Sequence, residues 1–124
     1  MKAKKILAVL ALTLAVSVTA FAKEEVWQYN QFTTIDMSTA KLSYPAGMET
    51  LTFETVEQAG DTTDYCTYVY NVDEQTIQRT KTKKSKYKSN FYPESVKNGN
   101  NVIKARARMA DAVLQKVMAE KNKK

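Results

Sequence analysis

The chain contains no histidine, one cysteine, three glycines and two prolines in 124 residues. Without histidine it lacks the commonest general base and the commonest metal ligand of enzymes. Its single cysteine, Cys66, provides neither an internal disulfide nor a cysteine pair for zinc. A glycine-rich phosphate loop and a Ser-His-Asp arrangement are also missing from the sequence. These absences predict a protein that is not an enzyme and that has no catalytic residues, metal or cofactor. A small enzyme that uses carboxylate or tyrosine chemistry remains an alternative.

The first 22 residues follow the order of a secretory signal peptide. Lysines at positions 2, 4 and 5 precede an apolar run over residues 6–18, and Ala20-Phe21-Ala22 has the small residues of a cleavage site. The apolar run is short for a transmembrane helix, which needs ~20 residues. We therefore expect residues 1–22 to be removed. Residues 23–124 then form a single mature domain without a transmembrane segment, which is periplasmic or secreted.

Charge is distributed unevenly along the mature chain. The leader holds three of the nineteen basic residues and none of the thirteen acidic ones, which leaves the mature chain at +3. Residues 23–78 carry two lysines against ten acids, whereas residues 79–124 carry fourteen basic residues against three acids. A cationic half of this kind either steers an anionic partner toward one end of the molecule or attracts the acidic half within the fold.

Residues 25–88 are rich in Thr, Tyr, Val and Phe, a composition that favours β-strands. Residues 37–40 are predicted to form a polar bend, Tyr44-Pro45-Ala46-Gly47 a turn, and residues 59–63 a loop. The predicted strands cover residues 26–32, 33–36, 49–56, 65–72, 76–83 and 87–92, the last ending at Pro93.

The pattern leaves the register of one hairpin open. A two-residue turn at Asp73-Glu74 pairs Tyr70 with Ile77, whereas a shift by one residue pairs Val69 with Ile77. A shift by one exchanges the two faces of a strand, so the two registers bury different side chains.

The last element is predicted to be an amphipathic helix over residues 102–119, preceded by an asparagine N-cap in Asn98-Gly99-Asn100-Asn101. Arg106 falls at the edge of the apolar stripe and is expected to extend outward. The stripe comprises Ile103, Ala107, Ala110, Val113, Leu114, Val117 and Met118. Because the stripe needs an apolar surface to cover, we predict an α+β fold. In this fold one C-terminal amphipathic α-helix packs on an antiparallel sheet of about five to six strands.

Two groups of reactive residue types are predicted to have structural roles. Cys66 lies in a strand-like run, where a buried cysteine acts as a small hydrophobic residue. Three close pairs of acids are predicted to be solvated surface charges: Glu24 with Glu25, Asp61 with Asp64, and Asp73 with Glu74.

Residues 79–88 form the most basic stretch of the chain and are the candidate binding site. Lysines of this kind either bind a polyanion or protect an edge strand from pairing with another chain. Aromatic residues on the strands are expected to pack within the fold, and no nucleic acid partner is expected, since no RNA-binding signature accompanies them. The candidate polyanion-binding residues are Arg79, Lys81, Lys83, Lys84, Lys86 and Lys88.

The layout resembles that of small exported proteins of the surface-adhesin E-like type. The matching stretches, in order, are Trp27-Gln28-Tyr29, Thr34-Ile35-Asp36-Met37-Ser38, Leu51-Thr52-Phe53, Tyr68-Val69-Tyr70-Asn71-Val72 and the helix over 103–117. The resemblance implies a signal peptide, an antiparallel sheet and a C-terminal amphipathic helix. It further implies attachment to host matrix proteins, or an envelope protein of other function, and it carries over no catalytic residue.

Together these features predict an exported, non-enzymatic domain that binds through its surface. The expected partners are an acidic envelope component, a polyanion or a host matrix protein, and the adhesin-like alternative uses the cationic strand 79–88.

Overall fold

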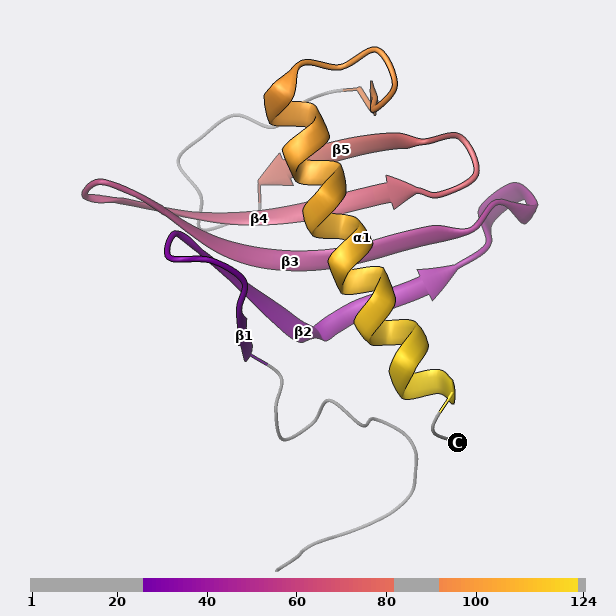
Figure 1. The fold of residues 1–124 in the computed structure, drawn as a ribbon, viewed down its shortest axis with the longest axis horizontal. Coiled ribbons are helices and arrows are strands. Elements are labelled where there is room, and N and C mark those ends of the chain that lie inside the picture. The colour runs from indigo at the N-terminus through magenta and orange to yellow at the C-terminus, as the bar shows by residue number, and fades with distance from the viewer. Residues whose placement is uncertain (1–25, 82–91, 123–124) are drawn as a thin grey trace, which may run out of the picture.

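A computed structural model describes residues 26–81 and 92–122 and has the predicted α+β fold. Six strands form one sheet and a single helix, α1 (Asn101–Asn122), crosses one of its faces diagonally (Figure 1). The predicted leader and its cleavage site lie outside the described residues. The strands are β1 (Val26–Gln28), β2 (Thr33–Ser43), β3 (Thr50–Ala59), β4 (Thr62–Asn71), β5 (Thr76–Lys81) and β6 (Glu94–Ser95).

The strands follow one another across the sheet in the order β1-β2-β3-β4-β5-β6, and each pair is antiparallel. In the β4–β5 hairpin Tyr70 pairs with Ile77, which confirms the first of the two registers, although the connecting turn spans residues 72–75. Gln75 adopts a φ of 55° within that turn, and its side-chain amide donates hydrogen bonds to Tyr70 Oη at 3.1 Å and to the Val72 carbonyl at 2.9 Å. The side chain of Gln75 thus supports a turn that contains no glycine.

Strand β2 runs through the bend that the sequence predicted at residues 37–40. The polar residues there form a bulge instead, with a shift in register between Asp36 and Lys41. Asp36 Oδ1 accepts hydrogen bonds from the backbone N–H and the hydroxyl of Ser38, and Thr39 Oγ1 donates to the Asp36 carbonyl. The side chains therefore satisfy backbone groups at the irregularity, and the strand continues.

Further boundaries differ from the prediction. The first strand, expected over residues 26–32, ends at Gln28 as β1. The loop expected at residues 59–63 shrinks to Gly60 and Asp61, because Gly60 takes a φ of +62° that closes a tight turn. The strand expected at residues 87–92 lies mostly outside the described residues, and its last member, Tyr92, is exposed and precedes the short β6. Pro93 directly precedes β6. The turn at Tyr44-Pro45-Ala46-Gly47 is confirmed as the 3₁₀ turn η1 (Pro45–Gly47).

The core lies between α1 and one face of the sheet. Alternate residues of β4 point toward the helix, as the burial of Asp64, Cys66, Tyr68 and Tyr70 shows. From α1, the buried residues are Ile103, Ala107, Met109, Ala110, Val113 and Val117. Met118, which was expected in the stripe, is 38% exposed, and Met109 is buried in addition to the predicted positions.

The start of α1 is fixed by Asn100 and Gly99. Asn100 Oδ1 accepts a hydrogen bond from the Ile103 N–H at 3.0 Å, which is the predicted asparagine N-cap. A Cβ atom placed on Gly99 would lie 2.7 Å from Ile103 Cβ and 2.7 Å from the Ser95 carbonyl oxygen. Glycine is therefore required where β6 and the first turn of α1 approach each other. The helix begins one residue earlier and ends three residues later than predicted.

Candidate functional site

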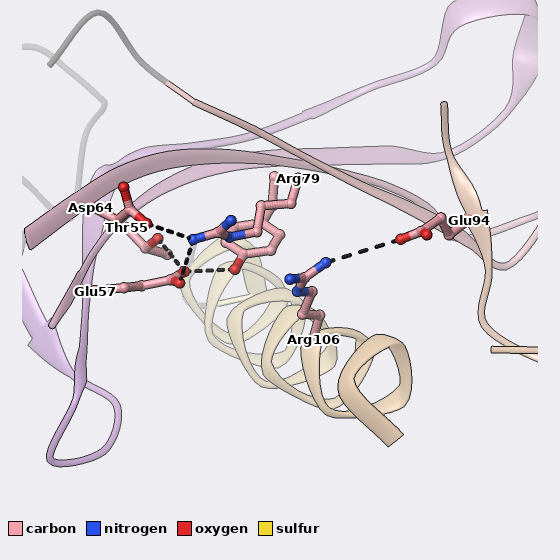
Figure 2. A network of polar contacts seen from close by, with 7 residues as sticks. Thr55, Glu57, Asp64, Arg79, Glu94 and Arg106 are labelled. Carbon is pink, nitrogen blue, oxygen red and sulfur yellow. Dashed lines mark hydrogen bonds and ion pairs between the residues drawn. The ribbon is translucent and has the colours of Figure 1, made fainter. Parts of the chain in front are cut away.

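Three charged side chains from neighbouring strands meet on the helix-covered face of the sheet. Arg79 of β5 contacts two carboxylates through Nη2, which lies 3.1 Å from Glu57 Oε1 on β3 and 3.2 Å from Asp64 Oδ2 on β4 (Figure 2). The exposed fractions of these side chains are only 10–21%. The arrangement is a largely buried ion-pair cluster rather than an open cationic surface.

The second oxygen of Glu57 is also engaged. Glu57 Oε2 accepts hydrogen bonds from Tyr68 Oη at 2.6 Å and from Thr55 Oγ1 at 2.8 Å. Both carboxylate oxygens thus have close donors, whereas Arg79 Nε is buried and has no hydrogen-bond partner among the described residues. The cluster holds the Glu57 carboxylate in one orientation.

Burial and charge shift the pKa of three groups in this cluster. Burial, reinforced by the adjacent Glu57 carboxylate, raises the pKa of Tyr68 far above that of a free tyrosine. Burial also raises the pKa of the Cys66 thiol to about 11, again with a contribution from Glu57. For Arg79 burial acts to lower the pKa, but the combined effect of its neighbours, of which Glu57 is the largest, outweighs burial and the pKa is raised. Tyr68 and Cys66 therefore stay protonated, and Arg79 stays charged, at neutral pH.

A cleft of about 490 Å³ lies beside this cluster, between the first half of α1, the β1–β2 turn and the central strands. Its volume is typical of sites for small molecules. Glu57 is the one carboxylate of its described lining, and Arg106 and Arg108 are its two cations. The lining residues are Tyr29, Asn30, Thr33, Glu57, Tyr68, Val102, Ala105, Arg106, Arg108 and Met109.

Cations gather along the half of α1 that borders the cleft. Lys104, Arg106 and Arg108 all precede Asp111, which is the first acid of the helix. The amino end of a helix carries a partial positive charge, which acidic side chains in the first turn normally stabilise. This half of α1 therefore concentrates positive charge that the helix does not itself compensate.

Arg106 is drawn toward the sheet edge rather than outward. Its Nη1 lies 4.0 Å from Glu94 Oε1 on β6, and the Arg106 side chain is 23% exposed (Figure 2). Arg108, two positions further along α1, is exposed.

Only two residues of the predicted cationic site lie in the described part of the chain. Arg79 is withdrawn into the ion-pair cluster, and Lys81 ends β5. Lys83, Lys84, Lys86 and Lys88 lie outside the described residues, so binding of a polyanion by residues 79–88 remains a prediction. Over its described length β5 pairs with β6 only through Thr76 and Ile77.

The prediction that the close acid pairs are solvated surface charges is wrong for Asp64, whereas Asp61, Asp73 and Glu74 are exposed as predicted. Asp64 is not a solvated loop residue: it lies in β4, is 7% exposed and pairs with Arg79. The alternation of β4 carried this signal, since Asp64 shares a face with Cys66 and Tyr68. The ion pair of Glu57 with Arg79 and that of Arg106 with Glu94 could not be read from the sequence, because they depend on which strands lie side by side and on how α1 packs on the sheet.

Among residues 26–81 and 92–122, no three acidic, cysteine or histidine side chains gather in a group able to hold a metal ion. Within the same ranges, α1 is too polar to cross a membrane. Comparison with known protein families, characterised proteins and solved structures finds no match to this chain.

Proposed function

We propose that the protein is an exported, non-enzymatic binding domain that takes an anionic molecule into the cleft beside α1. The observation that carries the proposal is the composition of the cleft. Arg106 and Arg108 line it, and its one described carboxylate, Glu57, is already paired with Arg79. An anion that enters the cleft therefore meets two guanidinium groups, which bind oxyanions through paired N–H donors.

A binding role is favoured over catalysis by the state of Glu57. A general base needs an oxygen that reaches the substrate proton, and a nucleophile needs an accessible lone pair. Glu57 instead accepts from Thr55 and Tyr68 through one oxygen and pairs with Arg79 through the other. Of the two tyrosines that line the cleft, Tyr29 and Tyr68, the hydroxyl of Tyr68 is likewise committed as a donor to Glu57.

The partner classes expected from the sequence remain part of this proposal. An acidic envelope component, a polyanion or a host matrix protein each presents carboxylate, sulfate or phosphate groups. The cleft admits a small anion or one anionic group of a larger partner. Residues 79–88 provide a separate cationic segment for a polyanion.

Titration with anilinonaphthalene sulfonate, which joins an anionic group to aromatic rings, tests the cleft. The probe is expected to become fluorescent on binding to the purified protein. Replacement of both arginines, Arg106→Gln with Arg108→Gln, is expected to weaken binding at least tenfold, since each charged hydrogen bond contributes ~1.5–3 kcal/mol.

Lys121→Gln is the matched control because it removes one positive charge from the exposed end of the same helix. Its dissociation constant should equal that of the unmodified protein. Equal affinities for the double arginine variant and the unmodified protein would contradict the proposal, provided that thermal unfolding shows both to be folded.

A further inference from the structure

Glu94 and Arg106 form a long ion pair at the edge of the cleft. Glu94 is paired in register with the buried Ile77, so its side chain lies on the face of the sheet that α1 covers. The 4.0 Å between Arg106 Nη1 and Glu94 Oε1 exceeds hydrogen-bond length, and the Glu94 side chain is 45% exposed. The pair therefore attracts through space without the directed N–H donation that makes arginine–carboxylate contacts strong.

The wall next to Arg106 is apolar. Val102, Ala105 and Met109 follow one another at spacings of three and four along α1, which places them on one side of the helix. Tyr29 and Tyr68 add aromatic rings from the β1–β2 region and from β4. Val102 is 54% exposed although it is a large apolar residue. The cleft thus combines a cationic edge with an apolar body.

We infer that the ligand is a small carboxylic acid with an apolar or aromatic body, and that the Glu94 carboxylate competes with the ligand carboxylate for Arg106. This inference rests on the proposed binding function of the cleft. It adds the chemical class of the ligand and names Glu94 as the group that competes with the ligand for Arg106.

A carboxylate is favoured because Arg106 already faces one. Exchange of Glu94 for a ligand carboxylate leaves the charge beside the guanidinium unchanged. A ligand that is not tethered to β6 can approach to the 2.7–2.9 Å of a directed contact, which Glu94 does not reach. Tyr68 contributes only its ring, since its hydroxyl donates to Glu57.

The inference is tested by calorimetry with three probes on the purified protein. The probes are 2-naphthoate, the uncharged 2-naphthalenemethanol, which has the same rings, and acetate, which has the charge without the rings. 2-Naphthoate is expected to bind at least tenfold more tightly than either of the other two.

The same titrations on variants identify the competitor. Glu94→Gln is expected to tighten binding of 2-naphthoate three- to tenfold and to leave 2-naphthalenemethanol unchanged. In an Arg106→Gln background the gain from Glu94→Gln should disappear, since the two residues act on one contact. Asp61→Asn, which removes one exposed negative charge from the β3–β4 turn, is the control and should change nothing. Glu94→Asp, which keeps the charge and shortens the side chain, should tighten binding less than Glu94→Gln and serves if the latter does not fold.

The remaining outcomes of these titrations show which part of the inference is wrong. If 2-naphthoate binds but the Glu94 variants leave its affinity unchanged, Glu94 is not a competitor, and the proposed function survives. 2-Naphthyl phosphate is titrated as a fourth probe. If it binds tenfold more tightly than 2-naphthoate, the carboxylate class is wrong. If neither 2-naphthoate nor anilinonaphthalene sulfonate binds, the proposed function itself fails.

Discussion

Tyr70 and Asp111 join the sheet to the helix across 41 positions of sequence. Tyr70 Oη donates a hydrogen bond of 2.8 Å to Asp111 Oδ1 on α1 and accepts one from Gln75 Nε2 at 3.1 Å. The Tyr70 side chain is buried, with 1% of its surface exposed. One hydroxyl thus connects β4, the β4–β5 turn and α1.

Alkaline pH should therefore weaken the fold through Tyr70. Burial, with the hydrogen bond to Asp111, raises its pKa to about 12 from the ordinary value near 10. Below pH 10 the hydroxyl is neutral in the folded and unfolded chain, and its contribution is fully present. Between these two pKa values the unfolded chain binds fewer protons, so the contribution is lost as pH rises through about 12.

Urea unfolding at several pH values measures this effect. Tyr70→Phe should be less stable than the unmodified protein by ~1–2 kcal/mol at pH 8, and the difference should shrink toward pH 12. Tyr44→Phe, at a tyrosine that is 56% exposed, is the control and should show neither effect. A difference that is independent of pH would contradict the role of the Tyr70 proton.

Loss of Arg79 should destabilise the protein. Arg79→Met keeps an aliphatic side chain at this position but leaves Glu57 and Asp64 without their shared cation. We expect a cost of roughly 2–4 kcal/mol, somewhat below that of breaking a fully buried pair, because the cluster retains some exposure to water. Denaturant unfolding at pH 7 measures it. The control is Lys121→Met on the exposed end of α1, and a loss no larger than that of the control would show that the cluster contributes little.

Gly99 should not tolerate a side chain. Gly99→Ala places a methyl group 2.7 Å from Ile103 Cβ and from the Ser95 carbonyl oxygen, and neither atom is a flexible side-chain end. Relief of the overlap moves β6 away from the first turn of α1, at a cost of about 1–3 kcal/mol. Thermal unfolding should show a lower midpoint for Gly99→Ala. The neighbouring Asn98→Ala, at an exposed position, should stay close to the unmodified protein.

Cys66 should react slowly with thiol reagents. Its side chain is 1% exposed, and burial raises its pKa to about 11, so the thiolate that reacts is scarce at pH 8. We expect labelling by a maleimide at pH 8 to be at least a hundredfold slower in the folded protein than in urea. Equal rates in the two conditions would show that Cys66 is accessible.

The cationic segment makes a prediction of its own. Reversal of Lys81, Lys83 and Lys86 to glutamate should abolish retention on heparin at moderate salt if residues 79–88 bind polyanions, because such binding depends on unscreened positive charge. The thermal midpoint should not fall. Retention that persists in the triple variant but is lost in the Arg106→Gln, Arg108→Gln variant would transfer polyanion binding to the cleft.

Local patterns predicted most of the elements of this fold. Composition predicted the strand over residues 65–72, most of which lies in β4, and the apolar stripe of α1 identified the helix and its asparagine cap. These features depend on residues a few positions apart in the chain, because the spacing of the apolar residues determines which face of a strand or helix is buried. The polar run over residues 37–40 was misread for the same reason, since a bulge and a bend use the same residue types.

The sequence by itself determined an antiparallel sheet of about five to six strands with one covering helix, the uneven charge, and the exclusion of histidine- and disulfide-based chemistry. Only the tertiary structure decided that Arg79 pairs with Glu57 and Asp64. It also decided that Arg106 lines a cleft and pairs with Glu94. These partners lie 12 to 22 positions apart in the chain and on different elements. Their distances depend on strand register and on the angle at which α1 crosses the sheet, and no local periodicity encodes either.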